Sequence, residues 1–221
     1  MEPGEIMGRT WQLYRAHWRR LIAIAAIVFV PLGGIAAALA LAGWPGVVAA
    51  NVLSLAATFL VQGALVKAVE DLRDGRADLG IAETFGHAGA QLVPLAAAGL
   101  LAAIGIFIGL LLLIVPGLVL WTWWLVVPAV IVLEHRPVLE SFRRSRELVR
   151  GTAWPVFGVV VLTVLILVAL GLVIAIVLVP VDSDLWRGFL GQAVADSLAA
   201  PFVAVAWTLT YFRLREIEER R

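Results

Sequence analysis

The chain has no cysteine and few charged residues. Cysteine is missing from all 221 residues, and only 15% of them are Asp, Glu, Lys or Arg. The missing cysteine excludes disulfides and thiolate metal sites. So small a share of charge could not cover the surface of a water-soluble domain, which places the chain in a lipid bilayer. The formal net charge of +1 gives no reason to expect nucleic acid as a partner.

Motifs for catalysis and for cofactor binding are missing as well. The sequence has no Walker loop, dinucleotide-binding fingerprint, HExxH pair or nucleophile elbow. Its three histidines, His17, His87 and His135, are far apart and lack the spacing of metal ligands. An enzyme that works inside the membrane would need an acid–base pair or a ligand set that this sequence does not offer. We therefore expect no catalytic residue, no cofactor, no metal and no enzymatic activity.

Long hydrophobic runs take up most of the chain. Hydrophobic residues make up 62% of the sequence, and the mean hydropathy is +0.98. A membrane-crossing helix needs about 20 mostly apolar residues. The runs predict an all-α bundle of six transmembrane helices in a single membrane domain, residues 1–221, without room for a sizeable soluble domain. The predicted spans are residues 21–43, 46–66, 92–115, 117–134, 154–181 and 188–212.

A proline–glycine pair separates the third and fourth spans. Residues 92–133 are 42 consecutive positions without a charge. At 1.5 Å per residue, one helix of that length would measure about 63 Å, twice the hydrocarbon thickness of a bilayer. The chain must therefore fold back. We expect the reversal at Pro116 and Gly117, because proline disfavours helix in the residue before it and glycine accepts left-handed backbone angles.

The basic residues are distributed unequally between the two sides of these spans. Sixteen of the 17 lie on one side, and only Arg187 lies on the other. By the positive-inside rule the basic side is the cytoplasm, so both termini are cytoplasmic. Arginine outnumbers lysine sixteen to one, and together with the many Ala, Leu, Val and Gly residues this is typical of a GC-rich bacterial genome. We therefore expect the cytoplasmic (inner) membrane of a bacterium.

Three amphipathic segments lie on the basic side, each ahead of a pair of spans. They cover residues 4–20, 79–91 and 137–150. The order of segment, span and span thus occurs three times, which suggests a threefold pseudo-repeat of helical hairpins. Faint sequence matches support the repeat, between residues 13–18 and 148–154 and between residues 54–59 and 197–202.

The third amphipathic segment carries four arginines, Arg143, Arg144, Arg146 and Arg150. Two interpretations are open. All three segments could anchor on anionic lipid at the membrane surface without any partner. Alternatively, the four arginines contact a lipid headgroup phosphate or a soluble protein.

Asp196 is the one acid that we place well inside a span. A charged aspartate at the middle of a spanning helix costs about 2.5 to 3.5 kcal/mol on insertion scales, so it should be neutral, paired or in contact with water. Candidate partners at similar depth are Asn51 and Ser54 on the second span, and Gln192 and Ser197 on the same helix as the acid. One interpretation is an interhelical hydrogen bond. The other is a proton or cation pathway, a role common for acids inside membranes.

Three tryptophans near the end of the fourth span also allow two interpretations. Trp121, Trp123 and Trp124 could line an apolar cavity for lipid. They could equally face lipid or pack between helices, as aromatic side chains commonly do.

Several runs together carry a family resemblance. They are IVPGLVLW at 114–121, VPAVIVLE at 127–134, ESFRRSRELVRG at 140–151 with Trp154, WQLYR at 11–15 with Trp18, and YFRLR at 211–215. This pattern resembles the membrane domain attached to some bacterial glycerophosphoryl diester phosphodiesterases, and related stand-alone six-helix membrane proteins. The resemblance implies a multi-pass membrane module whose own role is undefined. Phosphodiesterase activity in that family belongs to a separate soluble barrel domain, so the resemblance assigns no catalytic residue to this chain.

The sequence therefore favours a non-enzymatic, multi-pass membrane module that organises lipid or a partner protein at the cytoplasmic membrane. The expected partners are membrane lipids and a membrane or cytoplasmic protein. The alternative is a small transporter or channel that uses Asp196 and Asn51 near the outer half of the bundle.

Overall fold

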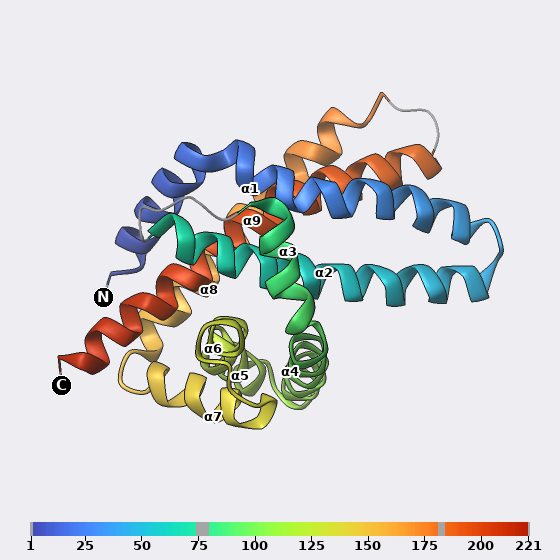
Figure 1. Cartoon of the computed structure of the whole chain (residues 1–221). Helices are drawn as coiled ribbons and strands as arrows, with labels where there is room; N and C mark the ends of the chain where they lie inside the picture. The colour runs from blue at the N-terminus through green and yellow to red at the C-terminus, as the bar shows by residue number, and fades with distance from the viewer. Residues whose placement is uncertain (1, 74–79, 181–183, 221) are drawn as a thin grey trace.

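The computed structural model describes residues 2–73, 80–180 and 184–220. Within these ranges the chain folds into helices and short connections without any strand, which confirms the all-α prediction (Figure 1). In chain order the helices are α1 (Pro3–Ala40), α2 (Trp44–Arg73), α3 (Ile81–Ala90), α4 (Leu92–Leu112), α5 (Ile114–Trp124), α6 (Val127–Glu134), α7 (Val138–Val149), α8 (Ala153–Val177) and α9 (Asp184–Glu219).

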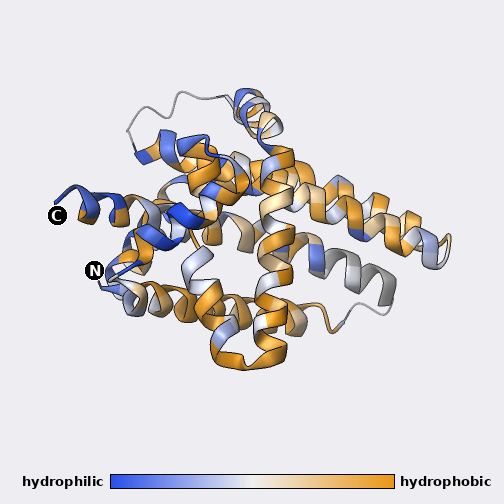
Figure 2. Cartoon of the chain, turned by 90° about the horizontal axis from the view of Figure 1, so that it is seen from below, coloured by the Kyte–Doolittle hydropathy of each residue, from blue (hydrophilic) through white to orange (hydrophobic). Residues whose placement is uncertain are grey.

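Among the described residues, six helical stretches are long and apolar enough to cross a membrane, which confirms the predicted number of spans. They are Pro3–Ala40, Trp44–Arg73, Leu92–Leu112, Ile114–Glu134, Ala153–Val177 and Gly191–Glu219. Figure 2 shows hydrophilic residues gathered toward the end of the molecule that carries both termini, whereas the long helices are mostly hydrophobic.

The first helix joins the first amphipathic segment and the first span. The sequence predicts two elements, residues 4–20 and 21–43, whereas α1 runs without interruption from Pro3 to Ala40. The two parts meet at His17, whose backbone angles leave the helical range (φ −122°, ψ 21°). The N-terminal part of α1 therefore changes direction at a bend within the helix and not through a loop.

Several other boundaries differ from the predicted ones. On the basic side α2 continues to Arg73, and α9 continues to Glu219, so charged residues extend these helices beyond the apolar runs. On the opposite side α4 ends at Leu112 and α8 ends at Val177, earlier than predicted. The helix α9 begins at Asp184, and residues 181–183 of the predicted outer loop lie outside the described residues.

The reversal between α4 and α5 lies ahead of the proline–glycine pair, so the prediction at this point is wrong. The chain turns at Leu113, which has an extended backbone (φ −163°, ψ 141°). Pro116 and Gly117 belong to the first turn of α5, where a proline is tolerated because the first N–H groups of a helix have no intrahelical partner. Gly117 lets α5 approach α4: a Cβ atom at this position would lie 2.4 Å from Cγ of Leu110 and 2.7 Å from its backbone nitrogen.

The predicted fourth span, residues 117–134, is divided into two helices. The helix α5 ends at Trp124, and α6 begins at Val127. Pro128 explains the break, because it has no N–H to donate to the carbonyl of Trp124 four residues earlier. The backbone of α5 consequently ends with carbonyl groups that other side chains can reach.

The long helices form three hairpins, α1–α2, α4 with α5 and α6, and α8–α9. Each hairpin follows one of the predicted segments, so the order of elements agrees with a threefold repeat, while the sequence repeat itself stays a prediction. The hairpins are not all parallel. Figure 1 views α4 and α5 almost end-on while α1 and α2 lie across the page, and the quarter turn of Figure 2 shows the α4–α5 hairpin along its length.

Two groups of buried side chains hold the hairpins together. One surrounds α6, where Val130 and Ile131 are fully buried in a group that also includes residues of α2, α4, α7, α8 and α9. The other surrounds α2, where Val61, Leu65 and Val69 are fully buried against α1 and α9. In a membrane these contacts stabilise the fold by close packing, because lipid chains are as apolar as the side chains themselves.

Ion pairs join helices at the end that carries the termini. Arg20 on α1 contacts Asp71 on α2 at 2.9 Å, and Arg73 on α2 contacts Glu216 on α9 at 3.0 Å. The guanidinium of Arg73 also lies 4.0 Å from the centre of the Phe212 ring. Part of the basic charge that sorts to this side is therefore neutralised by acids of neighbouring helices.

Candidate functional site

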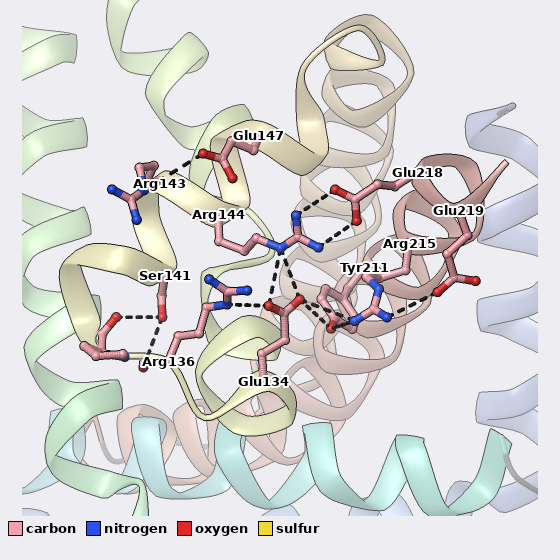
Figure 3. A network of polar contacts seen from close by, with 11 residues as sticks. Glu134, Arg136, Ser141, Arg143, Arg144, Glu147, Tyr211, Arg215, Glu218 and Glu219 are labelled. Carbon is pink, nitrogen blue, oxygen red and sulfur yellow. Dashed lines mark hydrogen bonds and ion pairs between the residues drawn. The ribbon is translucent and has the colours of Figure 1, made fainter. Parts of the chain in front are cut away.

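Glu134, the last residue of α6, is the centre of a polar network (Figure 3). Its side chain is only 10% exposed. The hydroxyl of Tyr211 on α9 donates to Oε1 at 2.9 Å, and Nε of Arg136 donates to Oε2 at 2.7 Å. Arg144 on α7 and Arg215 on α9 approach the same carboxylate at 3.3 Å and 3.6 Å. One acid thus connects α6, α7 and α9.

Arg144 is the second connection in this network. Its Nη1 and Nη2 atoms donate to the two carboxylate oxygens of Glu218 at 2.7 Å and 2.6 Å. This parallel geometry is the strongest form of an arginine–carboxylate contact. The hydrogen bonds to Glu218 raise the pKa of Arg144, with a smaller contribution from the charge of Glu134. The side chain of Arg144 is 15% exposed, so it faces the interior of the molecule.

The helix α7 is also held to the end of α5. The hydroxyl of Ser145 donates to the carbonyl of Trp123 at 2.7 Å, which supplies a partner for one of the carbonyls exposed where α5 ends. The rings of Phe142 and Trp124 meet edge to face with their centres 4.9 Å apart. Because contacts with α9 and with the end of α5 both hold α7, the face of α7 that makes neither contact has a defined orientation.

That remaining face carries arginines. Arg143 and Arg146 on α7 and Arg150 directly after it are spaced three and four residues apart, and all three are exposed. They line a cavity of about 510 Å³ together with Glu147 and Trp123. The guanidinium of Arg146 lies 4.5 Å from the centre of the Trp123 ring. We call this cavity the arginine cavity.

The ion pairing of these arginines is weak. Arg143 approaches Glu147 at 3.9 Å, and both side chains are more than half exposed, at 70% and 56%. Arg146 and Arg150 form no ion pair with any residue in the described part of the chain. The arginine cavity therefore keeps an excess of positive charge.

An apolar groove adjoins the arginine cavity. It has a volume of about 430 Å³ and lies between α5 and the first turns of α8. Its walls include Val115 and Val119 on α5, and Trp154 and Phe157 on α8. The two hollows share Trp123 and Ala153 as lining residues.

The four arginines predicted as lipid or partner contacts thus separate into two groups. Arg143, Arg146 and Arg150 line one cavity, as a common binding role requires. Arg144 instead points to Glu134 and Glu218 and is used to fix α7 (Figure 3). Of the three tryptophans, Trp123 lines both the arginine cavity and the groove, while Trp121 and Trp124 line a separate hollow of about 230 Å³ among α2, α4, α5 and α9.

The predicted intramembrane polar residues are only partly brought together. Asp196, Gln192 and Ser54 line a cavity of about 350 Å³ between α1, α2 and α9, and Nε2 of Gln192 donates to Oδ2 of Asp196 at 2.8 Å. Asn51 is exposed, donates to the carbonyl of Val47, and does not line this cavity. Ser197 is buried on another face of α9, and its hydroxyl has no partner among the described residues.

Sequence reasoning overlooked the network around Glu134. From the sequence alone, Glu134 and Tyr211 are noticed only as members of the runs that carry the family resemblance. A signal was available: a single acid ends the uncharged run of residues 92–133, and a buried carboxylate at that position requires a cation or hydroxyl nearby. Two of the partners, Tyr211 and Arg215, are 77 and 81 positions away in sequence, which spacing alone does not relate.

Residues 79–214 match a family described as a domain of unknown function, DUF7847. The matched region contains α5 to α8 and therefore both the arginine cavity and the groove. No curated protein and no solved structure matches the chain.

Proposed function

The chain belongs to the DUF7847 family of domains of unknown function, and we propose that it is a non-enzymatic membrane module that organises anionic lipid at the cytoplasmic membrane. One observation carries the proposal. The helix α7 is fixed to the bundle through Arg144 and Ser145, and it turns Arg143, Arg146 and Arg150 outward on the opposite face.

This arrangement supports lipid binding over a purely structural role for the arginines. Arginines that only close the fold would be paired with acids, as Arg144 is with Glu218. The arginines that line the arginine cavity are only weakly paired with acids, so most of their positive charge can attract a ligand. Each basic residue near an anionic membrane surface contributes about 1 kcal/mol of attraction. A protein partner with an acidic surface is the second occupant that the same charge would accept.

The proposal is tested by the composition of the lipid around the protein. Membrane patches are cut out with a styrene–maleic acid copolymer, and their phospholipids are compared with those of the whole membrane by mass spectrometry. We expect anionic phospholipid to be enriched around the native chain. The triple variant Arg143→Gln, Arg146→Gln, Arg150→Gln should lose that enrichment.

A matched triple variant on α1 provides the control. Arg9→Gln, Arg15→Gln and Arg19→Gln remove the same charge from exposed positions away from α7. Both triple variants should keep the thermal stability of the native chain. Patches with bulk lipid composition and no co-purified protein would refute the proposal, and an acidic protein in place of lipid would assign the arginines to a protein partner.

The cytoplasmic location of α7 in a bacterial inner membrane belongs to the same proposal. Its support is the sorting of 16 of the 17 basic residues to one side of the spans. Because the chain has no cysteine, Glu140→Cys on the exposed surface of α7 creates a single thiol. A membrane-impermeant maleimide should label it only after the cells are opened. Labelling in intact cells would place α7 outside and remove the basis of the proposal.

The resemblance to the membrane domain of some glycerophosphoryl diester phosphodiesterases is also part of the proposal. It supports a multi-pass membrane module without hydrolase chemistry of its own. The two partly buried carboxylates of the network are in keeping with this, because Glu134 and Glu218 are occupied by arginines. Release of soluble phosphodiester products by the purified chain from lipid vesicles would contradict it.

A small transporter or channel is a second candidate, and the cavity at Asp196 favours it. That cavity holds an acid, an amide and the hydroxyl of Ser54 within the apolar part of three helices. Flux of protons or cations into vesicles that contain the purified chain should then be lower for the variant Asp196→Asn. An unchanged flux and an unchanged pH dependence in that variant would exclude this role.

A further inference from the structure

The arginine cavity and the apolar groove adjoin each other, and we call the two together the depression. Trp123 lines both hollows, and its ring also lies under the guanidinium of Arg146. Ala153, at the start of α8, lines both hollows as well. A ligand that fills the whole depression must carry negative charge at one end and hydrocarbon at the other.

We propose that this depression binds one anionic phospholipid, with the phosphate at Arg146 and Arg150 and one acyl chain in the groove between α5 and α8. The inference deepens the proposed function, on which it rests, by assigning a single site and the class of ligand.

The charged end has the composition of a phosphate site. Three arginines and one acid, Glu147, line the arginine cavity, so its lining carries two positive charges in excess. Guanidinium groups recognise phosphate oxygens with paired N–H donors. Trp123 holds the guanidinium of Arg146 over its ring, which orders the side chain before a ligand arrives. The first N–H groups of α8 begin beside the same cavity, at Ala153, and add positive potential.

The uncharged end has the composition of an acyl-chain site. Apart from Thr122, whose hydroxyl is bonded to the carbonyl of Leu118, the groove is lined by apolar and aromatic side chains. It follows α5 from Trp123 to Val115, which is about 12 Å at the helical rise of 1.5 Å per residue. Trp154 closes one side and is 83% exposed in the isolated chain, which is typical of a surface that meets lipid.

The juxtaposition of the two ends decides between a lipid and a soluble anion. Free phosphate would use the arginine cavity and leave the groove open. An acidic protein would contact the exposed arginines without entering a groove that lies among membrane-crossing helices. A phospholipid is the ligand that fills both hollows at once, and it is present wherever this chain is.

The test titrates the purified full chain with defined lipids and counts bound molecules by native mass spectrometry. The lipids are phosphatidylglycerol and phosphatidylcholine with identical acyl chains, and glycerol 1-phosphate is the soluble competitor. We expect one phosphatidylglycerol to bind more tightly than phosphatidylcholine. The variant Arg146→Gln, Arg150→Gln should weaken phosphatidylglycerol binding by roughly thirtyfold, about fivefold for each charge.

Two variants test the acyl-chain end. Val119→Trp fills the middle of the groove, and Val115→Trp fills its open end, where the native side chain is 68% exposed and the substitution does not disturb packing. Both should weaken phosphatidylglycerol and phosphatidylcholine alike. Leu172→Trp on the exposed face of α8 is the control for added aromatic surface. Arg19→Gln is the control for the charge, because Arg19 lies over Trp18 as Arg146 lies over Trp123.

The outcomes separate this inference from the proposed function. If the arginine variant weakens lipid binding and both groove variants leave it unchanged, the groove is not an acyl-chain site and this inference is refuted, while the proposed function stands. Displacement of the lipid by glycerol 1-phosphate at equal concentration would identify a soluble-anion site and also refute it. If the native chain binds phosphatidylglycerol no more tightly than phosphatidylcholine, and the arginine variant weakens binding no more than Arg19→Gln does, both proposals fail.

Discussion

At the scale of single residues, neighbouring arginines on α7 have opposite roles. Arg144 contacts Glu134 and Glu218, whereas the side chain of Arg143 is 70% exposed and has one distant acid, Glu147. We expect Arg144→Gln to lower the free energy of unfolding by about 1 to 3 kcal/mol, because it removes charge-assisted hydrogen bonds and leaves Glu134 short of partners. Thermal or denaturant unfolding in mild detergent measures the effect.

Arg143→Gln is the matched control for this prediction, since it removes the same charge one position away. Its effect on unfolding should stay within about 0.5 kcal/mol, as for other exposed positions. Equal destabilisation by the two substitutions would mean that the network around Glu134 does not hold α7 in place.

At the scale of helical elements, the α4–α5 hairpin depends on glycine where the two backbones meet. A Cβ atom on Gly117 would lie 2.7 Å from the backbone nitrogen of Leu110, and one on Gly109 would lie 2.9 Å from Cα of Gly117. We expect Gly117→Ala to destabilise the chain by about 1 to 3 kcal/mol, because the helices must separate. Thermal unfolding checks this value.

The comparison for this substitution is Gly171→Ala on α8, where an added Cβ meets no atom within 4 Å. There the gain in helix propensity should stabilise the chain by about 0.4 to 1 kcal/mol. If both substitutions change stability in the same direction, close backbone approach is not what requires glycine in the hairpin.

The elements were predictable where the sequence signal is local. An uncharged run long enough for two helices predicts a reversal near Pro116, because hydrocarbon thickness limits one span. The exact turn at Leu113 was not predictable, since Gly117 serves a contact with α4 and not a backbone turn. The same holds for Glu134. The sequence shows that this acid needs a partner, but it does not show that Tyr211 is that partner, which depends on how α6 and α9 pack.

At the scale of the whole molecule, ion pairs connect helices both within a hairpin and between hairpins. Arg20–Asp71 lies within the first hairpin, while Arg73–Glu216 and Arg144–Glu218 link other elements to α9. These groups are partly exposed, so salt should weaken them. We expect the melting temperature in a non-ionic detergent to fall between about 0.01 M and about 1 M salt, where the Debye length shrinks from ~30 Å to ~3 Å.

The double variant Arg73→Gln, Glu216→Gln removes one of these links and should show a smaller dependence on salt than the native chain. A melting temperature that does not depend on salt in either protein would show that the hairpins are held by packing alone.

The crosswise α4–α5 hairpin also concerns the lipid that surrounds the protein. Hairpins that point in different directions cannot all stand upright in one flat layer of hydrocarbon about 30 Å thick. A bilayer responds to such a mismatch by thinning, thickening or bending at modest energetic cost. In a membrane the hairpins of this molecule therefore take different tilts, and we expect the lipid beside the most tilted one to adjust its thickness.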